Sequence, residues 1–172
     1  MLVSKKIQQA FNRQIGRELG ASLQYVAISA HFGAESLPEL QAFFERQANE
    51  ERDHAMKFVK FLVEAGGRVV VPAVPAPQSA FKSAQEAIAL SLKWEETVTE
   101  QIYELVDIAK SDKNYIAQRF LDWFVTEQLE EVSSMSQLLA VVERAGEKNL
   151  LYVEDYLARR PAPAGEADAE AG

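Results

Sequence analysis

The chain has 172 residues, 48% hydrophobic and 26% charged, which is the composition of one globular domain with a substantial core. Its net charge of −8 argues against general nucleic-acid binding, which depends on basic patches, and no apolar run reaches the roughly 20 residues of a membrane span. The lack of cysteine excludes disulfides, thiolate zinc sites and iron–sulfur clusters, and with no signal peptide visible we expect a cytoplasmic protein.

Two long helices are predicted in the first part of the chain. Apolar residues recur every three or four positions from about residue 4 to residue 32, and Gly33 then stops the pattern. The second helix is expected to begin at Ser36, because Ser36 and Glu39 have the spacing of a capping box. It ends before the Gly66-Gly67 pair.

The segment from residue 68 to residue 77 separates these helices from the next pair. Three prolines between residues 72 and 77 forbid a helix there, and the valines before them are expected to form a short extended segment. The segment is therefore predicted to be a long, extended connection.

Two further long helices and one short helix are predicted after this connection. The third begins at Ser83, which has Glu86 three residues later as in a second capping box. A break at Ser111-Asp112 is expected to cap the fourth helix, which continues to Gly146. A short fifth helix is predicted between residues 148 and 158.

The lengths of the connections predict an all-α, ferritin-like four-helix bundle with a short fifth helix at the C-terminus. Short connections make the first and second helices, and the third and fourth, antiparallel hairpins. The connection between the second and third helices spans roughly 50 Å when extended, enough to return along a bundle roughly 40 Å long. One long crossover of this kind is typical of ferritin-like bundles. We expect one domain over residues 1–160 and a disordered, acidic Pro/Ala-rich tail over residues 161–172.

Each of the four long helices carries a metal-capable side chain near its midpoint, on its predicted buried face. Buried acids are rare and costly unless paired, so several at one level of a bundle predict a multivalent cation rather than the surface or paired acids of a plain bundle. Four carboxylates balance two divalent ions, and mixed carboxylate and imidazole ligands suit iron, manganese or zinc, of which iron is favoured for redox work. The candidates are Glu18, then Glu51 and His54, then Glu95, and finally Gln128 and Glu131.

Over residues 4–158 the chain resembles a non-haem bacterial ferritin. The segments that carry the resemblance are Gln47–His54, which reads QANEERDH, and Trp123–Glu131, which reads WFVTEQLEE. The resemblance implies a di-iron ferroxidase centre within each subunit and ferric mineral stored inside a cage. It also implies a cytoplasmic homo-oligomer of 24 subunits, whose substrates are Fe(II) and dioxygen or peroxide.

The resemblance also implies a role for particular residues. The first iron would be held by Glu18, Glu51 and His54 with Gln128 nearby, and the second by a bridging Glu51 with Glu95 and Glu131. A third iron position would use Glu50, Glu127 and Glu130, with Glu131 reaching both the second and the third. Tyr25 and Trp123 resemble the oxidisable aromatic residues beside ferroxidase centres, and packing in the core is the alternative for both.

The chain departs from the haem-binding bacterioferritins at two points. Arg52 stands where those proteins bind haem through a methionine, so no haem is expected. They have Glu-x-x-His in the fourth helix, where this chain has Gln128 and Glu131. The weaker amide ligand suggests that iron passes through the centre rather than staying there.

Two other functions stay open at this stage. One is a non-storing di-iron or di-manganese oxidase of the same superfamily, which would hold two metals per chain in a small oligomer. The other is a structural subunit that stores mineral without its own ferroxidase activity, which the complete ligand set disfavours.

Overall fold

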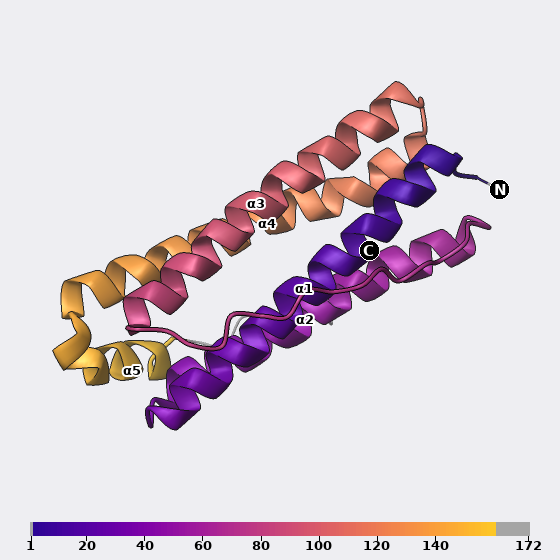
Figure 1. Ribbon diagram of the computed structural model, residues 1–172. Helices are drawn as coiled ribbons and strands as arrows, with labels where there is room; N and C mark the ends of the chain where they lie inside the picture. The colour runs from indigo at the N-terminus through magenta and orange to yellow at the C-terminus, as the bar shows by residue number, and fades with distance from the viewer. Residues whose placement is uncertain (1, 161–172) are drawn as a thin grey trace.

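The computed structural model describes residues 2–160, which form five α-helices and no strand. This confirms the predicted all-α, four-helix bundle with a long crossover and a short fifth helix (Figure 1). The predicted tail, residues 161–172, lies outside the described residues. The helices are α1 (Lys5–Ala34), α2 (Pro38–Glu64), α3 (Ala84–Ser111), α4 (Tyr115–Ala145) and α5 (Leu150–Ala158), with a 3₁₀ turn at Glu147–Asn149.

The bundle is built from two antiparallel hairpins joined by the crossover. Helices α1 and α2 form one hairpin and α3 and α4 the other, and the crossover returns along the bundle so that α3 runs parallel to α2 (Figure 1). Helix α5 packs across one end, in contact with α2 and α4. No helix within residues 2–160 has the length and hydropathy needed to cross a membrane.

Side-chain amides of α1 hold the crossover in its extended path. The backbone N–H of Val70 donates to Asn12 Oδ1 over 2.8 Å, and that of Gln78 donates to Gln24 Oε1 over 2.9 Å. The valine segment at residues 69–71 is therefore fixed by side chains of a helix rather than by pairing with a strand. These bonds satisfy backbone groups that a chain outside regular structure would otherwise leave to water.

The predicted cap at Ser83 is present, and Ser4 caps α1 in the same way. Ser4 Oγ accepts a hydrogen bond from the backbone N–H of Ile7 over 3.2 Å, and Ser83 Oγ accepts one from the N–H of Glu86 over 3.0 Å. The predicted cap of the fourth helix at Ser111-Asp112 is displaced, because Asn114 supplies it.

The predicted capping box at Ser36 is wrong. Ser36 adopts a positive φ of 60°, and the residue at the cap position of α2, Leu37, makes no side-chain cap. Instead Glu154 of α5 accepts hydrogen bonds from the backbone N–H groups of Glu39 and Leu40, over 2.8 and 2.9 Å. A carboxylate at a helix N-terminus satisfies free N–H groups and complements the helix dipole, so α5 replaces the local cap.

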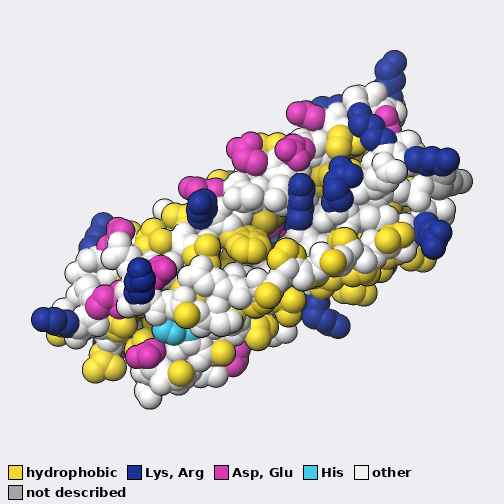
Figure 2. All heavy atoms as spheres, in the orientation of Figure 1, with side chains coloured by type: hydrophobic (Ala, Val, Ile, Leu, Met, Phe, Trp, Pro, Cys, Tyr) yellow, Lys and Arg dark blue, Asp and Glu magenta, His cyan; other side chains and the backbone are white. Residues whose placement is uncertain are grey.

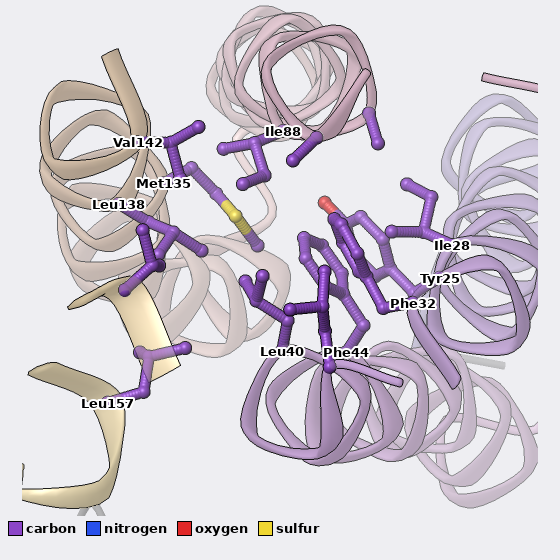
Figure 3. Close-up of a cluster of buried hydrophobic side chains, with 14 of the residues drawn as sticks. Tyr25, Ile28, Phe32, Leu40, Phe44, Ile88, Met135, Leu138, Val142 and Leu157 are labelled. Atoms are coloured by element: carbon purple, nitrogen blue, oxygen red, sulfur yellow. The ribbon is translucent and has the colours of Figure 1, made fainter. Parts of the chain in front are cut away.

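The hydrophobic core consists of two clusters, one toward each end of the bundle. One surrounds Tyr25, Phe44 and Met135, and Figure 3 shows it converging from all five helices. The other surrounds Phe11 and Phe58, whose ring centroids lie 5.0 Å apart in an edge-on arrangement. Between the two clusters lie the polar side chains that the sequence places at the helix midpoints.

Candidate metal centre

The six predicted ligands on the four long helices all lie in the polar layer between the two clusters. None exposes more than 4% of its surface. Helices with polar residues at their midpoints and apolar residues on either side bring those midpoints to one level when they pack. The residues are Glu18 from α1, Glu51 and His54 from α2, Glu95 from α3, and Gln128 and Glu131 from α4.

Glu18, Glu51 and His54 form the first group with metal-binding geometry. Each offers a ligand atom, and these atoms all lie within 4.8 Å of one another. His54 Nδ1 is 3.5 Å from Glu51 Oε2. The Oε2 atoms of Glu18 and Glu51 are buried and accept no hydrogen bond from another described residue, and without a cation the two carboxyl groups can only share a proton with each other. Buried carboxylate oxygens without donors are costly, and a bound cation would remove that cost.

The second group shares His54 with the first and adds Glu127 and Glu131. Its ligand atoms also lie within 4.8 Å of one another, and His54 Nε2 is 3.9 Å from Glu127 Oε1. Glu127 is partly exposed, whereas Glu131 is buried, so this group opens toward the surface. Glu50 is close enough for its charge to act on Glu131. Glu130 is exposed and lies in neither group.

Glu95 is held by two neighbours from other helices. Its Oε1 accepts a hydrogen bond from the hydroxyl of Tyr25, which points toward α3 in Figure 3. Gln128 Nε2 donates to the backbone carbonyl of Glu95 over 3.2 Å and to Thr99 Oγ1 over 3.1 Å. The buried hydroxyl of Tyr25 therefore has a polar partner in this layer. The amide oxygen of Gln128, the atom able to bind a cation, takes no part in these bonds.

Two buried amides contact the centre that were not predicted as part of it. Gln14 Nε2 donates to Glu18 Oε1 over 2.8 Å, which leaves the other oxygen of Glu18 as the unpartnered one. Gln47 donates to Glu50. Its own amide oxygen is buried without a donor among the described residues. Both lie three or four residues before a predicted ligand on the same helix face, a spacing that would have found them.

Burial and mutual repulsion raise the pKa values of the clustered carboxyl groups. Burial is the largest cause in every case, followed by repulsion from neighbouring carboxylates for Glu51 and Glu131. The pKa of Glu95 rises to about 7 and that of Glu131 to about 9, while the pKa of Glu51 lies well above its usual value. Without a cation this layer therefore retains protons at neutral pH, and a divalent ion would displace them.

His54 is electrically neutral at physiological pH. Burial lowers its pKa to about 4, helped by the positive charge of Lys57. The Lys57 ammonium lies 4.3 Å from the ring centroid of Trp123, and that ring lies 5.3 Å from the His54 ring. A neutral imidazole with both nitrogens directed toward carboxylates is the form that binds transition metals. Trp123 thus packs on His54 and lies beside the candidate site.

Comparison with known proteins identifies the family of this chain. The ferritin-like domain pattern matches residues 8–145. The ferritin BfrB of Mycolicibacterium smegmatis is 39% identical over 160 residues, covering 93% of this chain and 88% of the relative. The bacterial non-heme ferritin of Staphylococcus aureus is 36% identical over 153 residues, covering 88% of this chain and 92% of the relative.

The chain belongs to the ferritin family. The predicted resemblance to non-haem bacterial ferritins is thereby confirmed. Among solved structures, this ferritin is similar to an open-pore ferritin from the hyperthermophilic archaeon Archaeoglobus fulgidus, with a TM-score of 0.89 and 33% identity. The match covers 93% of this chain and 99% of the archaeal chain.

Proposed function

We propose that this ferritin stores iron and that it oxidises Fe(II) at the polar layer of each subunit. The observation that carries the proposal is the pair of ligand groups sharing His54, with buried carboxylate oxygens that no donor satisfies among residues 2–160. Membership of the ferritin family supports iron storage in general. The buried, oxygen-rich and imidazole-containing layer supports the ferroxidase step in particular.

In this proposal the two substrate Fe(II) ions are held by the six buried residues. Glu18, Glu51 and His54 bind the first ion, which fits the unpartnered oxygens of both carboxylates. Glu51 also bridges to the second ion, which Glu95 and Glu131 hold. Gln128 lies beside Glu95 and offers its amide oxygen as a weaker ligand.

A third iron position is assigned to the carboxylates on the more exposed side of the layer. Glu127 belongs to the second ligand group, and Glu50 acts electrostatically on Glu131. Glu130 is exposed one residue before Glu131, where it would meet iron leaving the buried layer. Glu131 would then serve both the second and the third positions.

The reaction removes one electron from each of two Fe(II) ions and gives both electrons, with two protons, to dioxygen or to hydrogen peroxide. Carboxylates fixed in a buried layer stabilise the extra positive charge of Fe(III) relative to Fe(II). Tyr25 holds Glu95 through its hydroxyl, and its pKa lies well above 10 because of burial and the neighbouring carboxylates. It therefore stays protonated, and we assign it a role as an oxidisable residue beside the centre.

The storage role requires an assembly that encloses a cavity, and we propose a homo-oligomer of 24 subunits without haem. The archaeal neighbour is described as an open-pore ferritin, which supports a hollow assembly here. Large apolar side chains are exposed on the single chain and need partners, among them Leu129, Leu151 and Tyr152, each exposed by more than 70%. Arg52 is exposed at the position that haem-binding relatives give to methionine.

Aerobic Fe(II) loading tests storage against the alternative of a non-storing di-metal oxidase. The protein is given many Fe(II) ions per chain and then separated by size-exclusion chromatography with detection of iron and protein. Iron in large excess over two per chain, eluting with a shell-sized particle, supports storage. About two metals per chain on a small oligomer would overturn it and favour the di-iron or di-manganese oxidase.

A further inference from the structure

A pocket lies beneath the crossover, between it and helices α1 and α3. Its volume is about 610 Å³, within the range of roughly 300–1,000 Å³ that small-molecule sites occupy. Helices α1 and α3 form two of its walls, and the Pro-rich part of the crossover forms the third. Figure 2 shows hydrophobic side chains following the crossover, with Lys and Arg side chains beside them.

The pocket is formed by glycines on α1 that lie beneath the crossover. A Cβ atom at Gly16 would lie 2.3 Å from Pro72 Cγ, so only glycine lets the crossover approach here. At Gly20 a Cβ atom would lie 3.7 Å from both Trp94 and Val74, at ordinary contact distance. Glycine at this position therefore leaves room on α1 for the Trp94 and Val74 side chains to pack closely.

The charged residues lining the pocket are all positive. Arg13, Arg17 and Lys93 line it, and no aspartate or glutamate does, in a chain whose net charge is −8. None of the three makes an ion pair with a carboxylate elsewhere in residues 2–160. Arg17 donates to the Gln14 amide oxygen over 3.2 Å through one of its five N–H groups, so it keeps donors for a ligand.

The apolar part of the lining offers flat surfaces. Trp94 reaches the pocket from α3 and is only partly buried, and three prolines of the crossover, Pro72, Pro75 and Pro77, face it. Aromatic rings stack on such surfaces, and guanidinium groups bind carboxylates and phosphates in two-point contacts. The apolar floor and cationic edge together select a ligand with both features.

We propose that this pocket binds a small aromatic anion, with its ring against Trp94 and the prolines and its carboxylate or phosphate on Arg13, Arg17 and Lys93. The pocket contains none of the predicted metal ligands. Arg17 does contact Gln14, the amide that donates to Glu18, and its charge acts on Glu18, so binding is tested without metal.

Binding is tested on the assembled, metal-free protein with defined probes. The chain has two tryptophans, so the Trp123→Phe variant leaves Trp94 as the only one and makes its fluorescence report on the pocket. The probes are 2-naphthoate, 1-naphthyl phosphate, the neutral 2-naphthalenemethanol and the aliphatic decanoate. Saturable quenching of Trp94 by the two aromatic anions, with the neutral alcohol at least about fivefold weaker, is expected. Naphthoate and naphthyl phosphate then distinguish a carboxylate from a phosphate site.

Two variants and one control locate the site by calorimetry. Arg17→Ala should weaken 2-naphthoate binding about fivefold to tenfold, because one charge-assisted contact is lost. Thr97→Phe should abolish it by filling the pocket from the exposed edge on α3. Lys60→Ala, which removes an exposed cation of α2 outside the pocket, should leave binding unchanged.

Three outcomes would overturn the proposal. Decanoate binding as tightly as 2-naphthoate would remove the aromatic assignment. Equal losses of 2-naphthoate affinity in Lys60→Ala and Arg17→Ala would show that general charge attraction, and not the pocket, holds the anion. Absence of binding to the assembled protein, with Thr97→Phe altering its elution volume, would show instead that a second copy of the chain covers the pocket.

Discussion

Glu51 and Glu154 are both buried carboxylates, and their surroundings are opposite. Glu154 lies at the N-terminus of α2, where two backbone N–H groups donate to its two oxygens. Glu51 lies in the polar layer, where one oxygen has no donor among the described residues and three other carboxyl groups act on it. The first arrangement stabilises the folded chain by itself, whereas the second has the unbalanced charge that a bound cation would compensate.

The surroundings alone, without comparison with related proteins, therefore distinguish a buried acid that stabilises the fold from one that is a candidate metal ligand. At both sites burial opposes the charged form, but at the helix terminus the fixed N–H dipoles offset that cost. In the polar layer the neighbours are acids, so the cost increases. A bundle that needed only stability would place apolar residues there, since replacing buried charges by well-packed apolar groups is often neutral or stabilising.

The largest expected effect is the change of the Tm of the metal-free protein with pH. The pKa of Glu131 is raised from 4.5 to about 9 and that of Glu95 to about 7, so the folded chain keeps protons that the unfolded chain has released. Their stabilising contribution is full below about pH 4.5 and is lost as the pH rises through 7 and 9. The Tm in EDTA should therefore fall by about 5 °C or more between about pH 6 and pH 9.

Two controls test the source of this slope. Glu131→Gln should flatten it, and Zn(II) should raise the Tm most at alkaline pH, where the carboxylates are ionised. His54 acts in the opposite direction, because its pKa is lowered from 6.5 to about 4. Its contribution is present above pH 6.5 and is lost as the pH falls toward 4. An unchanged alkaline slope in Glu131→Gln would contradict this account.

Glu51→Gln should separate activity from stability. Glu51 is assigned to both iron ions, so the initial rate of Fe(II) oxidation should fall on the order of 100-fold. The metal-free protein should keep its Tm at pH 7 within about 2 °C, because the pKa of Glu51 lies well above its usual value and the amide resembles the protonated acid. Stopped-flow absorbance and calorimetry measure the two quantities. Glu64→Gln, at an exposed position near the end of α2, should change neither.

Glu154→Gln should lower stability and leave activity unchanged, the reverse of Glu51→Gln. The carboxylate of Glu154 accepts from two backbone N–H groups, whereas the amide of glutamine can accept from only one of them and turns its NH₂ group toward the other. The negative charge at the helix terminus is also lost. We expect about 2 kcal/mol of destabilisation, seen as a lower Tm, with the oxidation rate per folded subunit unchanged. Glu147 accepts from the N–H groups of Ala84 and Gln85 over 3.0 Å each but is exposed. Glu147→Gln should therefore cost less than half as much, and a larger loss there would contradict the role of burial.

The sequence predicts the bundle and the buried positions of the candidate ligands more fully than the contacts between distant elements. The periodic seams and the length of the crossover determine the topology, and the midpoint residues identify the polar layer. The cap of α2 could not be predicted, because Glu154 lies 115 residues away from Glu39 and only the docking of α5 brings it there. The Ser36 pattern was a local signal overridden by this tertiary contact. The pocket beneath the crossover likewise depends on the path of an irregular segment.

Gln14 gives the smallest expected effect, because its contact with Glu18 shares features with both the Glu154 and the Glu51 sites. It is a buried neutral donor to Glu18, over 2.8 Å, and it satisfies one oxygen while leaving the other for a cation. Gln14→Met keeps the approximate volume and removes the donor, so Glu18 should lose its fixed orientation. The affinity of the centre for Co(II) should fall about tenfold, with a changed Co(II) absorption spectrum, as expected for a residue that orients a ligand. Gln101→Met removes an acceptor 3.5 Å from Gln14 Nε2 and leaves the Gln14–Glu18 hydrogen bond in place, so it should lower the affinity less than about twofold. If both variants bind Co(II) like the wild type, packing alone positions Glu18. The orientation of its unpartnered oxygen would then be set by the position of Glu18 on α1 and not by the hydrogen bond from Gln14.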